Sequence, residues 1–308
     1  MGRIPNTSLD VFPLCLGGNV FGWTADEQQS FDVLDAYAAA GGNFVDTADA
    51  YSAWVPGHSG GESETIIGRW MAARGARNRM VIATKVGMKP GLKGLSPATI
   101  RTAAEASLRR LGIDRIDLYY AHADDPATPL AESLRAFDAL VKEGKVRYIA
   151  ASNYTAPRMA EALAVSSREG LVRYIALQPH YNLVNRNEYE GELRDLCARE
   201  GLACFPYFAL AKGFLTGKYR PGTQVESPRA AAARTYLDER GLRLLAVLDD
   251  IAAAHHTTVA AVSLAWLVAQ PTVVAALASA RAVAQLADLL PFVDVTLSPG
   301  ELVRLATA

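Results

Sequence analysis

The stretch Gly41-Gly42-Asn43-Phe44-Val45-Asp46-Thr47-Ala48-Asp49-Ala50-Tyr51 contains one full step of the pattern that decides the fold. A helical pattern over 26–40 ends on glycine, and the short apolar run Asn43–Val45 has the length of a buried strand. A polar residue, Asp46, follows the run at once. The stretch therefore predicts a helix, a buried strand and a polar side chain at the carboxyl end of that strand.

The same step recurs from one end of the chain to the other. The runs that predict strands are Leu14–Gly17, Asn43–Val45, Val81–Thr84, Ile116–Ala121, Val146–Ala151, Tyr174–Leu177, Ala203–Pro206 and Val273–Ala278. Helical patterns lie at 26–40, 62–74, 97–111, 130–143, 155–169, 189–200, 240–269 (two helices), 282–290 and 299–306. A chain of 308 residues can form one large barrel or two domains. Eight β/α steps without a change of composition favour an α/β fold, a closed (β/α)8 TIM barrel forming a single domain over 1–308.

The composition excludes several classes of protein. Thirty-one lysine and arginine residues balance 32 aspartate and glutamate residues, so no net field attracts a nucleic acid. Cys15, Cys197 and Cys204 are too scattered for a zinc framework and fit a reducing cytoplasm. The start of the chain lacks the apolar core of a signal peptide, and polar residues interrupt the most apolar stretch, 260–280. We expect a cytoplasmic protein with no membrane or nucleic-acid partner, and no pattern indicates an oligomeric state.

Polar or reactive residues follow seven of the eight predicted strands. They are Asp46, Lys85, His122, Ser152, Gln178, Tyr207 and Ser279. One such residue is ordinarily a helix cap or a solvated loop residue, but the carboxyl ends of barrel strands all open on one face. The pattern therefore predicts one pocket, and the long connection over 208–240 is expected to cover it as a cofactor and substrate loop.

Four residues near these strand ends form a set suited to carbonyl reduction. Hydride addition requires a proton for the developing alkoxide, and a tyrosine such as Tyr51, with an ordinary pKa of about 10, is a weak donor and relay at neutral pH. The ammonium of Lys85 is expected to lower that pKa, and Asp46 to keep the ammonium charged. His122 can donate a hydrogen bond to the carbonyl oxygen.

The stretch from Gly41 to Tyr51, followed by Gly61-Glu62-Ser63-Glu64, resembles the signature of the aldo-keto reductases. Ser152-Asn153-Tyr154, Gln178-Pro179-His180-Tyr181-Asn182 and the segment from Pro206 to Tyr219 are similar to further motifs of that family, and the resemblance covers essentially the whole chain. It implies a barrel enzyme with Asp46, Tyr51, Lys85 and His122 as its catalytic residues, and a small carbonyl compound as its substrate.

The resemblance also implies a nicotinamide cofactor and the residues that bind it. Ser152, Asn153 and Gln178 would hold the carboxamide, and Tyr207 would stack on the nicotinamide ring. The diphosphate loop would use Phe208, Leu210, Gly213, Leu215 and Lys218, and the adenosine phosphate site Ser279, Arg281 and Gln285. The chain departs from the common family pattern at Phe208, Ser279, Ala282 and Leu289, where many members have serine, glycine, lysine and asparagine.

The form of the cofactor depends largely on Arg281. A 2′-phosphate dianion requires a fork of donors, which Arg281 can supply, with Ser279 and Gln285 adding neutral donors. Ala282 leaves out a second cation. We therefore expect NADP(H) to be preferred moderately, with NAD(H) possible.

Several other features of the sequence are typical of other classes of protein. The segment 213–218 resembles a phosphate-binding P-loop only faintly, because its glycine spacing is one residue short. No second histidine lies at ligand spacing from His122, so no metal is expected. Trp23 and Trp54 follow strand ends and would wall an aromatic substrate pocket, or else pack on the rim of the barrel. Two alternatives stay open: a Schiff-base lyase using Lys85, and a cofactor-sensing regulatory subunit similar to potassium-channel β-subunits.

Overall fold

A computed structural model describes all residues, 1–308, and its centre is a curled sheet of eight parallel strands. The strands follow one another around the sheet in the order β11-β10-β9-β8-β5-β4-β3-β12. Their bounds are β3 (Leu14–Gly17), β4 (Phe44–Asp46), β5 (Val81–Val86), β8 (Ile116–Ala121), β9 (Val146–Ser152), β10 (Tyr174–Gln178), β11 (Ala203–Cys204) and β12 (Ala276–Ala278). Each of the eight predicted apolar runs overlaps one of these strands.

Backbone hydrogen bonds between β11 and the segment leading into β12 close the sheet. The N–H of Cys204 donates to Thr272 O (2.8 Å), and Val274 N–H donates back to Cys204 O (3.2 Å). Leu277 N–H then donates to Pro206 O (3.0 Å). The predicted (β/α)8 barrel is confirmed, and the seam between β11 and β12 is its shortest stretch of strand pairing.

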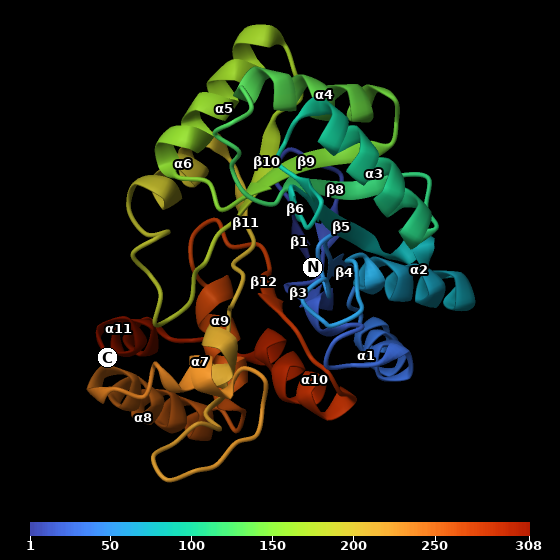
Figure 1. Cartoon of the computed structure of the whole chain (residues 1–308). Coiled ribbons are helices and arrows are strands. Elements are labelled where there is room, and N and C mark those ends of the chain that lie inside the picture. Colours follow the sequence, from blue (N-terminus) through green and yellow to red (C-terminus); the bar gives the residue numbers. More distant parts are fainter.

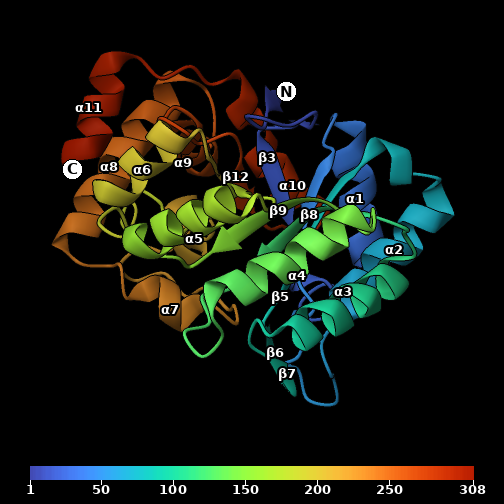
Figure 2. The ribbon, with the colours of Figure 1, turned by 90° about the horizontal axis from the view of Figure 1, so that it is seen from above.

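Helices surround the strands, with α3 and α4 on one side and α8 and α11 on the other (Figures 1 and 2). Their bounds are α1 (Glu27–Ala39), α2 (Glu62–Arg74), α3 (Pro97–Leu111), α4 (Leu130–Lys142), α5 (Ala156–Glu169), α6 (Glu192–Glu200), α7 (Ala230–Arg234), α8 (Glu239–Ala254), α9 (Val259–Val268), α10 (Val283–Leu289) and α11 (Pro299–Thr307). Local signals in the sequence set several ends. The Ser96 hydroxyl accepts from Thr99 N–H with Pro97 in the first turn, and α6 ends at Gly201, whose φ of 63° favours glycine.

Two short antiparallel hairpins were not predicted. One pairs β1 (Gly2–Arg3) with β2 (Asp10–Val11), and the other pairs β6 (Met88–Lys89) with β7 (Leu92–Lys93) directly after β5. The first hairpin places Ile4, Leu9 and Val11 in one buried cluster with side chains of the barrel interior. It therefore closes the end of the barrel opposite the carboxyl ends of the strands.

The connection after β11, expected as a loop over 208–240, contains short helical pieces. They are η3 (Ala211–Thr216) and α7, and α8 begins at Glu239. No single helix is long and apolar enough to cross a membrane; only α8 and α9 taken together reach that length and composition, and a bend of 95° separates them.

Candidate active site

Lys85 is the centre of a buried polar cluster at the carboxyl ends of the strands. It extends from β5, and neither its side chain nor that of Asp46, at the end of β4, is exposed. Its ammonium donates to Asp46 Oδ2 (2.5 Å), Thr47 O (2.9 Å) and Tyr51 Oη (3.0 Å). The other oxygen of Asp46 accepts from Gln178 Nε2 (3.0 Å). Every charge in the cluster is therefore paired, as burial requires.

The phenol of Tyr51 lies between the carboxylate of Asp46 and the ammonium of Lys85. Its hydroxyl donates to Asp46 Oδ2 (3.3 Å) and accepts from Lys85. Burial, followed by the negative charge of Asp46, raises the pKa of Tyr51 well above its ordinary value. The expectation of a lowered pKa is wrong, because burial and the carboxylate outweigh the ammonium. Tyr51 therefore keeps its proton throughout the neutral range.

His122 follows β8 and contacts the same cluster from the side. Its ring centre lies 6.0 Å from that of Tyr51. Burial, with a smaller contribution from Lys85, lowers the pKa of His122 to about 3, so the imidazole is neutral. Its Nδ1 has no partner within the protein, which leaves a buried polar atom available to a ligand.

The residues expected around a nicotinamide ring form a connected network. Ser152 Oγ donates to Gln178 O (2.9 Å), and Asn153 Nδ2 donates to His122 O (2.9 Å). The hydroxyl of Tyr207 donates to Asn153 Oδ1 (2.8 Å). Asn153 has a φ of 57°, a strained conformation that persists where surrounding contacts enforce it. The structure thus brings these four residues together beside His122, while the amide group of Gln178 is already engaged by Asp46.

The segment expected at the diphosphate begins with another strained turn. Phe208 has a φ of 51°, and its carbonyl accepts from Asn182 Nδ2 (2.9 Å). Of the other expected residues, Leu215 is buried in the core, so only its backbone is available to a ligand. The Lys218 ammonium lies 5.3 Å from the centre of the Tyr219 ring. Leu210 and Gly213 flank the kink of η3, where Gly213 has a φ of 100°.

The third expected group lies after β12. Arg281 N–H donates to Gln285 Oε1 (3.0 Å), and the guanidinium of Arg281 has no protein partner. The Ser279 hydroxyl, however, donates to Asn19 Oδ1 (2.5 Å), so it is not free for a phosphate until that bond is exchanged. A side chain at Gly17 would come within 2.5 Å of Ser279 Oγ, which explains the need for glycine at the end of β3. An arginine, an amide and a hydroxyl together are a donor set that fits a phosphate.

The two tryptophans expected to wall a substrate pocket meet each other next to Tyr51. The Trp23 and Trp54 rings are arranged edge to face, 5.5 Å apart, and Trp54 lies 6.2 Å from the Tyr51 ring. Half of Trp54 is exposed. They form an aromatic wall that leads from solvent toward the phenol of Tyr51.

Two residues of the site escaped the sequence reasoning. Asp49 lies in the segment that joins Asp46 to Tyr51; it is fully buried, and neither of its carboxylate oxygens has a partner. Burial and the nearby charge of Glu64 raise the pKa of Asp49 to about 7. Arg229, at the start of α7, lies over the Trp23 ring. The position of Asp49 between two candidate residues was a usable signal, but nothing in the sequence links Arg229 to Trp23.

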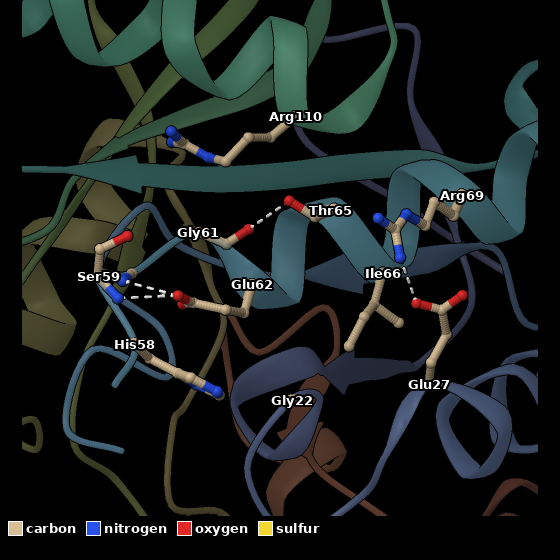
Figure 3. A pocket seen from close by; sticks show the side chains of 11 residues that line it. Gly22, Glu27, His58, Ser59, Gly61, Glu62, Thr65, Ile66, Arg69 and Arg110 are labelled. Carbon is tan, nitrogen blue, oxygen red and sulfur yellow. Dashed lines mark hydrogen bonds and ion pairs between the residues drawn. The ribbon is translucent and has the colours of Figure 1, made fainter. Parts of the chain in front are cut away.

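A polar hollow lies at the start of α2 (Figure 3). Its lining includes Arg69 and Arg110, which pair with Glu27 (2.7 Å) and the buried Glu64 (2.6 Å). Glu62 accepts from the backbone N–H of Ser59 (2.9 Å). None of Asp46, Tyr51, Lys85 and His122 lines the hollow.

Comparison with known proteins agrees with this geometry. Residues 13–307 match the model of the aldo/keto reductase family. The uncharacterized oxidoreductase YrpG of Bacillus subtilis is 34% identical over 301 residues, 94% of this chain and 90% of that protein. A probable voltage-gated potassium channel subunit beta of Oryza sativa subsp. japonica is 32% identical over 305 residues, 95% of this chain and 90% of that protein. An aryl-alcohol dehydrogenase of Pestalotiopsis microspora is 31% identical over 279 residues, 85% of this chain and 70% of that protein.

The chain belongs to the aldo/keto reductase family and is an oxidoreductase of that family by its match over most of its length. Members generally use NAD(P)H and act on small carbonyl compounds. The fold resemblance inferred from the motifs is confirmed.

Proposed function

We propose that this protein reduces an aldehyde or ketone to an alcohol, with NAD(P)H as the reductant and Tyr51 as the proton donor. The observation that carries the proposal is the Lys85 ammonium, which is fully buried with Asp46 and contacts Asp46 and Tyr51 at 2.5 and 3.0 Å. In the net reaction the carbonyl, one NAD(P)H and one proton give the alcohol and NAD(P)⁺. The bound nicotinamide would supply the hydride to the carbonyl carbon.

The side chains of the chain handle the proton and the developing charge. Tyr51 is protonated at neutral pH and gives its proton to the carbonyl oxygen. The adjacent Lys85 ammonium stabilises the phenolate that forms, and Asp46 holds that ammonium in place. His122, being neutral, can donate one hydrogen bond to the same oxygen without competing for the proton.

The binding residues follow from the same arrangement. Ser152, Asn153 and Gln178 are proposed to hold the carboxamide, and Tyr207 to stack on the nicotinamide ring. The segment with Phe208, Leu210, Gly213, Leu215 and Lys218 would hold the diphosphate. The group of Ser279, Arg281 and Gln285 would bind the 2′-phosphate, which favours NADPH over NADH. Trp23 and Trp54 would contact the substrate.

The experiment is an assay of NADPH oxidation against aldehydes, ketones, quinones and sugars, made with the wild type and Tyr51→Phe. We expect Tyr51→Phe to reduce kcat/KM about 100-fold or more while NADPH affinity stays nearly the same, because only the proton transfer is lost. Tyr37→Phe is not a suitable control, because that buried hydroxyl donates to Leu14 O. Tyr148→Phe is the suitable control, because the Tyr148 hydroxyl contacts Ser8 at the protein surface. An active Tyr51→Phe enzyme would contradict the assignment.

Two alternatives make different predictions. A Schiff-base lyase requires a free amine, whereas the Lys85 ammonium is ion-paired with Asp46. Borohydride trapping with a carbonyl substrate would detect such a lyase. A regulatory subunit, suggested by the likeness to plant potassium-channel subunits, would bind NADPH tightly with negligible turnover and form a stable complex with a larger partner.

We also infer a cytoplasmic location. The three cysteines are free and buried, which suits a reducing compartment.

A further inference from the structure

Arg229 is a cation at the mouth of the candidate site that the proposed reaction does not use. It precedes α7, and its guanidinium carbon lies 5.6 Å from the centre of the Trp23 ring and 6.0 Å from that of Phe208. The two rings belong to different parts of the site. Trp23 follows β3 on the proposed substrate side, and Phe208 follows β11 on the proposed cofactor side.

The guanidinium of Arg229 is half-buried and has no anionic partner. Its side chain makes no hydrogen bond or ion pair, and only its backbone N–H bonds Ser227 Oγ. Elsewhere in the same connection, Arg220 pairs with Asp249 at 2.7 Å. Burial lowers the pKa of Arg229, with no carboxylate nearby to offset it. A cation that is removed from water and left without a counter-ion is costly, and a negatively charged ligand would compensate it.

Arg229 also acts on the reacting group. Its positive charge lowers the pKa of the Tyr51 phenol, against the larger raising effects of burial and Asp46. Consecutive contacts of 5.6 Å from Arg229 to Trp23, 5.5 Å from Trp23 to Trp54 and 6.2 Å from Trp54 to Tyr51 link the guanidinium to the phenol, so that one aromatic molecule lying along them can reach both. Between them lie Trp54, which contacts the Tyr51 ring edge to face, and Trp23.

A second unpaired cation lies at the same mouth. The Lys212 ammonium is 5.6 Å from the centre of the Phe208 ring, and it too lacks an ion pair. Lys212 has a φ of 58°, a conformation that few lysines adopt without enforcement by their surroundings. The entrance thus combines aromatic walls with uncompensated positive charge.

We propose that Arg229 binds an acidic group of the substrate, so that the preferred substrates are aromatic aldehydes or ketones that carry a carboxylate. The proposal rests on the reduction assigned above to Tyr51. The ring of such a substrate would lie against Trp54 and Trp23 with its carbonyl oxygen at Tyr51. Its carboxylate would pair with the planar guanidinium of Arg229, whose geometry suits two parallel hydrogen bonds.

The other anion that could reach Arg229 is a phosphate of the cofactor. The cofactor phosphates have candidate partners of their own in Lys218 and in the group that contains Arg281. Arg229 differs from those residues in contacting Trp23 and in acting on Tyr51, and both of these lie on the substrate side. We therefore favour the substrate carboxylate, and the cofactor phosphate becomes an outcome of the test.

The experiment compares 4-carboxybenzaldehyde with its neutral counterpart, 4-formylbenzamide, in the wild type, Arg229→Leu, Arg229→Lys and Arg243→Leu. Arg243 is exposed on α8 and has no ion pair, so Arg243→Leu is a matched loss of charge outside the site. We expect the wild type to prefer the carboxylate. In Arg229→Leu the ratio of kcat/KM values, carboxylate over amide, should fall about 10- to 150-fold, the range for a charge-assisted hydrogen bond. Arg229→Lys should restore part of the ratio, because it keeps the charge and loses the fork.

Two further measurements separate the possible failures. NADPH affinity is measured for each variant; a tenfold or larger loss in Arg229→Leu with an unchanged substrate ratio would show that Arg229 binds a cofactor phosphate, and would overturn the proposal. Binding of terephthalate to the wild-type protein with NADP⁺ is followed by tryptophan fluorescence, which needs no turnover. If terephthalate binds the wild type and Arg229→Leu abolishes that binding, the anion site is supported even when neither aldehyde is reduced. If the wild type reduces both aldehydes at equal rates, the anion site is overturned and the proposed function stays intact.

Discussion

The half of the barrel from β3 to β8 and the half from β9 to β12 differ in how their charged side chains are paired. In the first half, Asp46 and Lys85 are fully buried, and their charged atoms are held by short contacts within the protein. In the second half, the cations of Arg229 and Arg281 lack protein partners and are partly exposed. The first half holds its charges in a geometry that is complete without a ligand. The second half presents charges that only a ligand can pair.

Non-glycine residues with positive φ are concentrated in the second half, although Ser52, next to Tyr51 in the first half, has a φ of 70°. Asn153, Phe208, Ala211 and Lys212, all after β9 or β11, have positive φ values without being glycine. Such strain is retained where surrounding contacts enforce it, and it is typical of binding segments. The difference indicates that substitutions in the first half should affect turnover, and substitutions in the second half should affect affinity and selectivity.

The largest effect is expected from Lys85→Met, which removes the charge at the centre of the first half. We expect kcat to fall roughly 10³-fold with NADPH affinity nearly unchanged, because the phenolate of Tyr51 loses its cation. Alcohol oxidation by the remaining activity should shift to a more alkaline pH, measured as a kcat profile.

Because Lys85→Met leaves Asp46 buried and unpaired, its folding must be checked by thermal unfolding. The double variant Asp46→Asn with Lys85→Met restores neutrality and should recover stability without recovering turnover. Lys93→Met, an exposed lysine without an ion pair, is the control. High activity with an unchanged pH profile would remove Lys85 from the mechanism.

Asp49 is the exception within the first half, since its buried carboxylate oxygens are unpaired. Its pKa of about 7 lies above the value of about 3.9 for an unfolded chain, so the native state binds more protons between these values. The contribution of Asp49 to stability therefore falls as pH rises from 4 to 7 and is constant above that. Asp49→Asn should remove this dependence, so that the variant gains roughly 2–4 kcal/mol over the wild type across that interval.

The measurement for Asp49 is the free energy of unfolding by urea at pH 4 to 8. Asp294→Asn changes an exposed carboxylate without a partner. Its free energy of unfolding, relative to the wild type, should therefore not change between pH 4 and 7. If the difference between Asp49→Asn and the wild type stayed level from pH 4 to 7, Asp49 would not titrate as a buried acid and the first half would have no exception.

A smaller effect, confined to binding, is expected from Arg281→Ala in the second half. We expect a moderate preference for NADPH over NADH in the wild type. Loss of the guanidinium should weaken NADPH binding about 10- to 150-fold, or roughly 1.5–3 kcal/mol, and should leave NADH binding nearly unchanged. Fluorescence quenching by each cofactor measures this, with Arg243→Ala as the control. Equal affinities in the wild type, or a preference that survives the substitution, would show that Arg281 does not recognise the phosphate.

The sequence predicted the first half better than the second. Asp46, Lys85 and His122 each follow an apolar run, so the strand pattern alone brings them to one end of the barrel. The pairing of Ser279 with Asn19 joins residues 260 positions apart, and no local pattern carries that information. The lowered pKa expected for Tyr51 was wrong because burial, which a sequence does not give, dominates it.

The short strands of the two antiparallel hairpins were also beyond reach. β1 pairs with β2 through only two residues each, too few for a periodicity to emerge. The contact of Arg229 with Trp23 depends on the path of the connection over 208–240, which is set by packing rather than by any repeated pattern.

The seam between β11 and β12 has a consequence for how the barrel moves. Because so few backbone bonds close the barrel there, we expect local opening to begin along that line, on a slow timescale, while the other strand pairs stay formed. Tyr207 and Phe208 leave β11 directly beside the seam, whereas Lys85 is across the barrel from it. A nucleotide held as proposed at Tyr207 and Phe208 would then be exchanged through fluctuations of the seam without disturbing the ion pair of Asp46 and Lys85, so that cofactor release and reduction would be governed by separate parts of the barrel.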